Sequence, residues 1–135
     1  MLILGAGLSG IGSAELAKRN SLDILLSESN EIDVKIKSKL KKLDIEFEEN
    51  SHTNAKTYSA DIVIKSPGIP DESEIINSLS KKGFSIISEI EFASLFSSTP
   101  AIGVTGSNGK TTTATIIHKL LTDANINCSI SGNIG

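Results

Sequence analysis

Short apolar runs alternate with longer amphipathic stretches along most of the chain, and this order is typical of successive βα units around a parallel sheet. The runs predicted as strands are residues 2–4, 23–26, 45–48, 61–64 and 84–87. A helix is predicted from the glycine loop at 5–10 to about residue 19, and further helices are predicted at residues 31–42, 70–82 and 89–96. In the helix at 31–42, isoleucines and leucines fall on one face while lysines gather toward its end, as the helix dipole favours. The pattern predicts an α/β domain.

A break in the pattern follows at Ser97-Ser-Thr-Pro100, a short polar segment that ends in proline and suits a domain boundary. We therefore assign residues 1–97 to a first domain and residues 98–135 to the beginning of a second. Within the second, Ala101–Val104 and Ile126–Ile130 are predicted as strands on either side of a helix. One helix and two strands are too few to bury a core, so we expect the second domain to be truncated.

The segment Val104–Thr113, VTGSNGKTTT, has the parts of a phosphate-binding loop although the glycine that the Walker A spacing requires is replaced by Val104. Glycines permit a tight turn, backbone N–H groups at a helix start bind anions, a lysine adds charge, and a threonine hydroxyl can bind magnesium. The alternative is a glycine-rich turn that merely starts a helix, but Lys110-Thr111 directly after Gly109 favours phosphate. The residues assigned to the nucleotide phosphates are Gly106, Ser107, Asn108, Gly109, Lys110, Thr111 and Thr112.

A second glycine loop, Gly5-x-Gly7-x-x-Gly10, follows the first predicted strand and opens the first predicted helix, which is the setting of a Rossmann-like dinucleotide motif. Glu28, at the end of the second strand, stands where a ribose-binding carboxylate would lie. Tight packing of helix on strand could require the same glycines, and Glu28 could equally be a solvated loop acid. Two anion-binding loops in one chain indicate an enzyme that holds a diphosphate-linked substrate and ATP.

Composition, net charge and cysteine content limit the classes of protein to which the chain can belong. Apolar residues make up 39% and charged residues 21% of the chain, and no apolar run approaches the length of a membrane helix. The net charge is −3, and the basic residues concentrate in 35–42, so we expect a solvated helix face, no nucleic-acid partner and no membrane. One cysteine, Cys128, fits a reducing compartment, and a cytoplasmic location is expected. His52 and His118 are expected to be structural or solvated.

Five segments together resemble the Mur ligases of peptidoglycan synthesis: GAGLSG at 5–10, SPGI at 66–69, SEIEF at 88–92, VTGSNGKTTT at 104–113 and GNIG at 132–135. The resemblance covers essentially the whole chain. The phosphate loop of that family is the compact T-G-[ST]-x-G-K-[ST] form, which accounts for Val104. The family likeness implies a Rossmann-like parallel-sheet domain that binds a UDP-sugar, followed by the start of a P-loop ATPase domain.

The resemblance also implies roles for single residues. Leu8, Ser9 and Gly10 would lie near the diphosphate and uridine, Ser66, Pro67 and Gly68 would border the uracil pocket, and Asn133 would contact the UDP-sugar. Ser27 and Glu28 match the uracil-contacting strand end only loosely. Lys110 is the implied catalytic residue at the ATP phosphates, and Thr111 the implied ligand of Mg²⁺.

The details of the glycine loops favour the family member that adds D-glutamate to UDP-N-acetylmuramoyl-L-alanine through an acyl phosphate, with ATP as the phosphoryl donor. The D-glutamate site would lie outside this chain, so we expect the chain alone to be inactive. Three alternatives remain: a Mur ligase that adds a different amino acid, a relative of folylpolyglutamate or cyanophycin synthetases, and a non-catalytic dinucleotide-binding module. The second of these would not be expected to carry a G-x-G-x-x-G domain before the compact loop.

Overall fold

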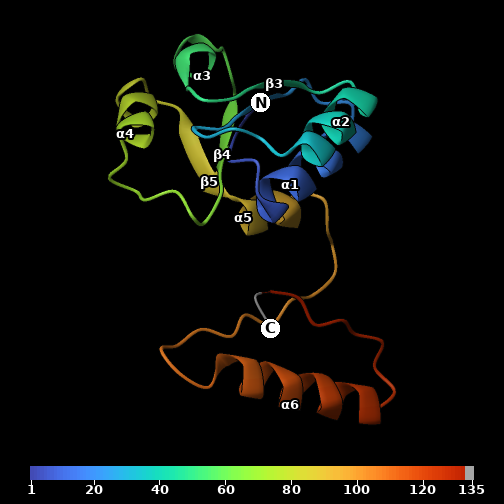
Figure 1. The fold of residues 1–135 in the computed structure, drawn as a ribbon. Coiled ribbons are helices and arrows are strands. Elements are labelled where there is room, and N and C mark those ends of the chain that lie inside the picture. The colour runs from blue at the N-terminus through green and yellow to red at the C-terminus, as the bar shows by residue number, and fades with distance from the viewer. Residues whose placement is uncertain (133–135) are drawn as a thin grey trace. The chain divides into compact units, whose positions relative to one another are not determined.

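The computed structural model describes residues 1–132 and divides the chain into two compact units, residues 1–98 and 99–135 (Figure 1). The first unit is an α/β domain with a five-stranded parallel sheet, as the alternating pattern predicts. The strands are β1 (Leu2–Leu4), β2 (Leu25–Ser27), β3 (Glu46–Glu48), β4 (Ile62–Lys65) and β5 (Ser85–Ser88). Their order across the sheet is β3-β2-β1-β4-β5.

Helices cover both faces of this sheet because successive residues of each strand point to opposite sides. The helices of the first unit are α1 (Leu8–Arg19), α2 (Val34–Lys42), α3 (Thr53–Thr57), α4 (Glu74–Lys81) and α5 (Glu89–Ser94). Ile3, Leu26 and Ile64 pack with buried residues of α1, α2 and α5 on one face. Leu2, Leu25 and Val63 pack with those of α3 and α4 on the other face. Figure 1 shows the two groups of helices on opposite sides of the strands.

The strand order reverses direction at β1, and this reversal creates the position at which open α/β sheets bind ligands. From β1 the chain builds outward through β2 to β3, then returns to the other side of β1 with β4. Because β2, β1 and β4 are parallel neighbours, the loops that follow them begin side by side at the carboxyl ends of the strands. These three loops contain the first glycine motif, Glu28 and the SPGI segment.

Two predicted helices begin later than the sequence pattern indicates. The predicted start at residue 31 is wrong because Asp33 caps α2, accepting a hydrogen bond from the Lys35 N–H at 2.8 Å. Ile32 is buried ahead of the helix and only mimics its apolar face. Likewise α4 begins at Glu74, after a turn in which the N–H of Ser73 bonds the carbonyl of Pro70. The short helix α3 was not predicted.

The second unit contains one helix, α6 (Lys110–Asp123), among its described residues 99–132. The predicted helix after the phosphate loop is confirmed, but the predicted strands at 101–104 and 126–130 are wrong, since neither segment pairs with a strand. Apolar sequence favours a strand, yet a strand forms only where a neighbour accepts its backbone hydrogen bonds. No residue among 99–132 is buried. None of the helices described for residues 1–132 is long and apolar enough to cross a bilayer.

Candidate functional site

The first and third glycines of the loop after β1 are required by packing. Gly5 has φ +97°, a conformation that side chains rarely adopt, and an added Cβ would lie 2.7 Å from the Ser66 Oγ. At Gly10 an added Cβ would lie 1.9 Å from the carbonyl oxygen of Gly5. The packing explanation of the motif is therefore sufficient for these two positions.

The second glycine is different, because nothing in the fold requires it. Gly7 has φ −73°, which any residue can adopt, and an added Cβ would meet no atom within 4 Å. It is exposed and precedes α1, whose first N–H groups have no partner inside the helix. A glycine that faces open space at a helix N-terminus lets a ligand approach the backbone closely, which is the role of the second glycine in dinucleotide motifs.

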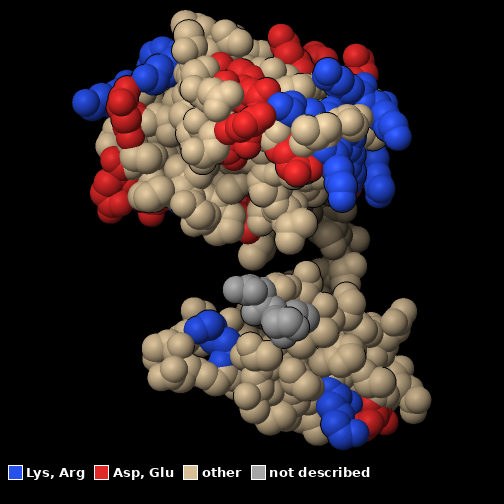
Figure 2. All heavy atoms as spheres, viewed as in Figure 1, with Lys and Arg blue, Asp and Glu red and all other residues tan. Residues whose placement is uncertain are grey.

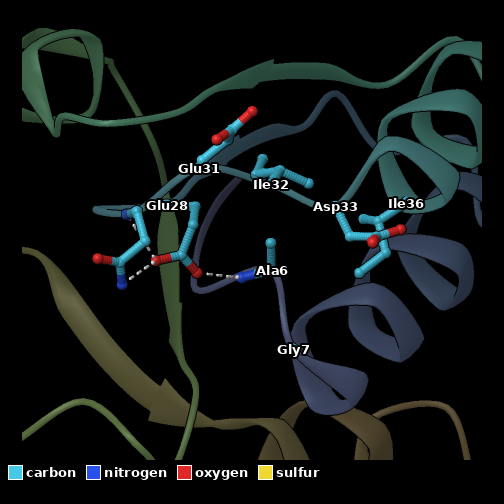
Figure 3. A pocket seen from close by; sticks show the side chains of 8 residues that line it. Ala6, Gly7, Glu28, Glu31, Ile32, Asp33 and Ile36 are labelled. Carbon is cyan, nitrogen blue, oxygen red and sulfur yellow. Dashed lines mark hydrogen bonds between the residues drawn. The ribbon is translucent and has the colours of Figure 1, made fainter.

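Glu28 holds this loop in place. Its Oε2 accepts a hydrogen bond from the Ala6 N–H at 2.8 Å, and its Oε1 accepts one from the Asn30 N–H at 3.0 Å (Figure 3). Burial acts to raise the pKa of Glu28, but hydrogen bonds from Ala6, Asn30 and Ser29 outweigh it and keep the pKa below its usual value. Glu28 is therefore an ionised brace between β2 and the glycine loop, with both carboxylate oxygens already engaged.

Two hollows flank Glu28 at this edge of the sheet. The first, of about 280 Å³, lies between the glycine loop and the start of α2 (Figure 3). Three carboxylates line it, those of Glu28, Glu31 and Asp33, with no lysine or arginine among the lining residues. Such a lining repels phosphate groups.

The second hollow, of about 310 Å³, lies on the other side of Glu28 and is bordered by the loop after β4. Its walls combine apolar side chains with a few polar groups, which is the usual make-up of a small-molecule site. The lining residues are Gly5, Glu28, Ser29, His52, Gly68, Ile69, Pro70, Ser73, Glu74 and Ile75. Both hollows touch the glycine loop, the first at Ala6 and Gly7 and the second at Gly5, but the second has the more apolar wall. It is therefore the better candidate for the base of a nucleotide, and we call it the β4-side pocket.

A buried hydrogen-bond network joins Glu48 and Ser27 to His52, which lines the β4-side pocket. Glu48, 8% exposed, accepts hydrogen bonds from the Ser27 Oγ at 2.7 Å, the Ala55 N–H at 2.7 Å and the Asn54 N–H at 2.8 Å. The Ser27 Oγ also lies 2.6 Å from the Nδ1 of His52. Burial acts to raise the pKa of Glu48, but these hydrogen bonds together hold it below its usual value.

Sequence reasoning missed this network. It treated residues 45–48 as a half-buried strand without singling out Glu48, and it expected His52 to be structural or solvated without naming a partner for it. A polar residue in an alternating strand looks solvent-facing, and its partners lie in a helix that the sequence pattern does not predict. A run of Ser, His, Thr and Asn directly after the strand, SHTN at 51–54, was the available signal, because such residues favour helix starts.

We expect Glu48→Gln to lower the free energy of unfolding by at least about 2 kcal/mol, because an amide NH₂ would face backbone donors that now share a carboxylate. Glu46→Gln is the matched control, since Glu46 lies in the same strand but is exposed. Because folding lowers the pKa of Glu48, its contribution is fully present above its usual value of 4.5 and is lost as the pH falls through the folded value. Urea unfolding at several pH values measures both effects. Equal losses in the two variants would contradict the assignment.

The remaining residues proposed for the substrate lie around the same edge. Leu8 is 96% exposed beside the loop, Ser9 is half-buried with its hydroxyl 3.4 Å from Glu89, and Gly10 is buried. Pro67 and Gly68 are exposed in the loop after β4, and Gly68 lines the β4-side pocket. Ser27 and Ser66 have buried side-chain oxygens, and Ser66 packs against Gly5. Asn133 lies outside the described residues.

The phosphate loop of the second unit has the backbone of an anion-binding turn. Gly106 has φ +148° and Gly109 has φ +75°, and both values favour glycine. Gly109 caps α6, so the N–H groups of Lys110, Thr111 and Thr112 form the first turn and have no partner inside the helix. The Lys110 Nζ donates to the carbonyls of Gly106 and Ser107. Ser107 and Asn108 lie in the exposed turn between the glycines.

Charge in this unit is concentrated at the loop. Residues 99–132 contain two basic side chains, Lys110 and Lys119, and Lys119 pairs with Asp123 at 3.1 Å (Figure 2). Lys110 therefore supplies the positive charge beside the exposed N–H groups, and this donor set fits a phosphate group. No cluster of His, Cys, Asp or Glu in residues 1–132 could hold a metal alone. A magnesium ion at Thr111 would need oxygen ligands from phosphate and water, as such sites commonly have.

Comparison with known proteins agrees with this geometry. Residues 3–75 match the family described as MurD N-terminal domain. All 135 residues align with UDP-N-acetylmuramoylalanine--D-glutamate ligases from Christiangramia forsetii, at 52% identity, and Bacteroides fragilis, at 44%. The chain spans only 30% of the length of each of these relatives.

Solved structures lead to the same family of folds. A murein peptide ligase from Psychrobacter arcticus superposes with a TM-score of 0.65 at 26% identity, covering 92% of this chain and 26% of that one. The UDP-N-acetylmuramate-alanine ligase MurC from Thermotoga maritima superposes with a TM-score of 0.58 at 24% identity, covering 92% of this chain and 29% of that one. The second likeness supports the fold alone.

Proposed function

Because the chain belongs to the MurD N-terminal domain family, we propose that it is the substrate-binding part of a ligase that adds D-glutamate to UDP-N-acetylmuramoyl-L-alanine. The observation that carries the proposal is Gly7, the one glycine of the first loop that packing does not explain and that borders a helix N-terminus. The diphosphate of the substrate lies at the N–H groups of Leu8, Ser9 and Gly10. Its uridine occupies the β4-side pocket, which Glu28 and Gly68 line. Ser66 and Pro67 belong to the same loop as Gly68, and the buried Ser27 acts on the pocket through its contact with His52.

The second unit binds ATP in this proposal, as the start of a central ATP-binding domain. The N–H groups of residues 106–112 and the Lys110 ammonium group contact the phosphates, and the Thr111 hydroxyl binds Mg²⁺. Such a loop stabilises the charge that spreads over a transferred phosphoryl group, chiefly by position and electrostatics. The alanyl carboxylate attacks the γ-phosphorus of ATP and releases ADP, and the amino group of D-glutamate then attacks the acyl carbon, releasing inorganic phosphate and a proton. The D-glutamate site lies outside this chain.

A non-catalytic dinucleotide-binding module is the second candidate, and the engagement of Glu28 argues against it. A carboxylate that reads a ribose needs free acceptor positions, whereas the Glu28 Oε1 already accepts hydrogen bonds from Ser29 and Asn30 and its Oε2 accepts one from Ala6, which leaves little capacity for a ribose. The hollow where an adenosine ribose would lie, beside Glu28 and α2, is lined by three carboxylates. Both features disfavour NAD relative to a uridine nucleotide on the opposite side.

Calorimetric titration of the 135-residue chain with UDP-N-acetylmuramoyl-L-alanine and with NAD separates the two candidates. The ligase proposal expects binding of the UDP-sugar at least about tenfold tighter than binding of NAD, a difference of about 1.4 kcal/mol. UDP alone should bind more weakly than the full substrate but still more tightly than NAD. Preference for NAD would favour the dinucleotide module.

Lys110→Ala is expected to weaken the binding of ATP in the presence of Mg²⁺ by at least about tenfold, because a charge-assisted hydrogen bond contributes about 1.5 to 3 kcal/mol. Lys119→Ala is the matched control, since it removes the other lysine of α6, at the far end from the loop. The binding curve is read from the amide signals of residues 106–112 in a nuclear magnetic resonance titration. If both variants bind ATP equally well, Lys110 does not contact the phosphates.

A further inference from the structure

The orientation of protons in the buried network under the β4-side pocket can be worked out from its geometry. The Ser27 hydroxyl carries one proton and lies 2.7 Å from the Glu48 Oε1 and 2.6 Å from the His52 Nδ1. An ionised carboxylate only accepts hydrogen bonds, so Ser27 must donate its proton to Glu48. The Ser51 carbonyl, 3.4 Å from the same hydroxyl, is also only an acceptor, so the Ser27 oxygen can only accept from His52. The proton of the neutral imidazole ring is therefore on Nδ1.

This arrangement leaves the other ring nitrogen as an acceptor. In the neutral ring with a proton on Nδ1, the Nε2 atom carries a lone pair. Within residues 1–132 the only hydrogen bond of the His52 ring is the one at Nδ1, and the residue lines the β4-side pocket. Glu48 thus acts through Ser27 to fix which nitrogen of His52 can accept a hydrogen bond from a ligand.

The surroundings of His52 keep the ring neutral. Burial lowers the pKa of His52 below its usual value, and Lys56 acts in the same direction, whereas Glu48 and Glu28 act to raise it. Glu74 also lines the pocket, but it forms an ion pair with Lys56 at 2.6 Å. Near neutral pH, His52 is therefore a neutral residue with one free acceptor nitrogen, and it lines the pocket together with Ile69, Pro70 and Ile75.

We propose that His52 selects the base of the bound nucleotide, its Nε2 atom accepting a hydrogen bond from the imide N–H of a uracil ring. The inference rests on the proposed function, since it assigns the base to the β4-side pocket. The imide of uracil presents an N–H donor, whereas the corresponding ring nitrogen of cytosine presents a lone pair. A neutral Nε2 therefore attracts uracil and repels cytosine at that position. Protonation of His52 reverses this, because Nε2 then becomes a donor.

The test compares UDP and CDP binding to the 135-residue chain between about pH 5 and pH 8, the range in which histidines titrate. We expect UDP to bind at least about tenfold more tightly than CDP at the upper end, for one hydrogen bond gained and one repulsion avoided. The preference should shrink as the pH falls through the His52 pKa. In nitrogen-15 spectra of the imidazole rings, His52 should show the Nδ1-protonated form, with His118→Gln used to assign the two histidines.

His52→Asn is the informative variant, because an asparagine side-chain amide can donate to Ser27 from about the place of Nδ1 but offers nothing at Nε2. It should unfold at nearly the same urea concentration as the parent chain and lose the preference for UDP over CDP together with its pH dependence. His52→Phe, which lacks both nitrogens, should lose stability as well as preference.

Several results would overturn the inference. One is an unchanged preference for UDP over CDP in His52→Asn. Another is equal weakening of UDP and CDP binding in that variant, which would place a ribose hydroxyl at Nε2. A third is a proton found on Nε2 in the parent chain. These results would leave the proposed function standing provided that UDP still binds at the glycine loop. If the parent chain binds neither UDP nor the UDP-sugar, the proposed function fails and the inference fails with it.

Discussion

Gly10→Ala is expected to unfold the first unit or to lower its free energy of unfolding by more than about 4 kcal/mol, the range of severe steric substitutions. The added methyl group would lie 1.9 Å from the carbonyl oxygen of Gly5. That oxygen belongs to the backbone of the loop after β1 and cannot rotate away as a side chain would. Relief would require α1 to move from β1, and this would open the core formed by Ile3, Ile11 and Ala14. Small domains have only about 5 to 15 kcal/mol of stability to lose.

Gly12→Ala provides the matched control for that experiment. Gly12 lies two residues further along α1, is exposed, and would place an added Cβ in contact with no atom within 4 Å. Alanine favours a helix over glycine by about 1 kcal/mol, so this variant should be as stable as the parent or slightly more stable. Circular dichroism during urea unfolding measures both. A Gly10→Ala chain as stable as Gly12→Ala would contradict the described packing of α1 on β1.

Gly7→Ala is expected to weaken UDP binding by about 30-fold to 1,000-fold, which corresponds to about 2 to 4 kcal/mol. A methyl group at this position would stand between the diphosphate and the N–H groups at the start of α1, so several hydrogen bonds would lengthen at once. The fold should tolerate the change, because Gly7 has an ordinary φ of −73° and open space around it. Loss of the glycine N-cap should cost less than about 1 kcal/mol.

The contrast between Gly7 and Gly10 separates binding from packing within one motif. Stability should fall in Gly10→Ala and affinity in Gly7→Ala, with little overlap between the two effects. Calorimetry with UDP and urea unfolding on the same protein samples give both quantities. If Gly7→Ala binds UDP as tightly as the parent chain, the loop has only a packing role and the diphosphate does not lie there.

The fold of the first unit was predictable because its core residues sit in short continuous apolar runs. Leu2-Ile3-Leu4 and Ile62-Val63-Ile64 are strands covered on both faces, and such runs stand out without an alignment. Errors arose where local sequence imitates an element. Ile32 has the spacing of a helix face but packs before α2 begins, and Ala101–Val104 has the composition of a strand without a neighbour to pair with.

The candidate site was predictable only in part, for a physical reason. Glycine loops can be recognised in a sequence because glycine is needed at defined spacings. The network of Glu48, Ser27 and His52 joins residues that are 21 to 25 positions apart in sequence through a buried carboxylate. No local pattern marks such a group. Glu28, interpreted from its position as a substrate ligand or a solvated acid, also braces Ala6 in the structure, and no local pattern marks that role.

The central claim is that a uridine nucleotide binds along the glycine loop and the β4-side pocket. Its most direct test is a nuclear magnetic resonance titration of the nitrogen-15-labelled chain with UDP, followed at every backbone amide. We expect the largest shifts at residues 5–10 and 66–70, with a further change in the His52 ring, and little change in α2. Shifts confined to α2 and to residues 30–33 before it, or none at saturating UDP, would contradict the claim.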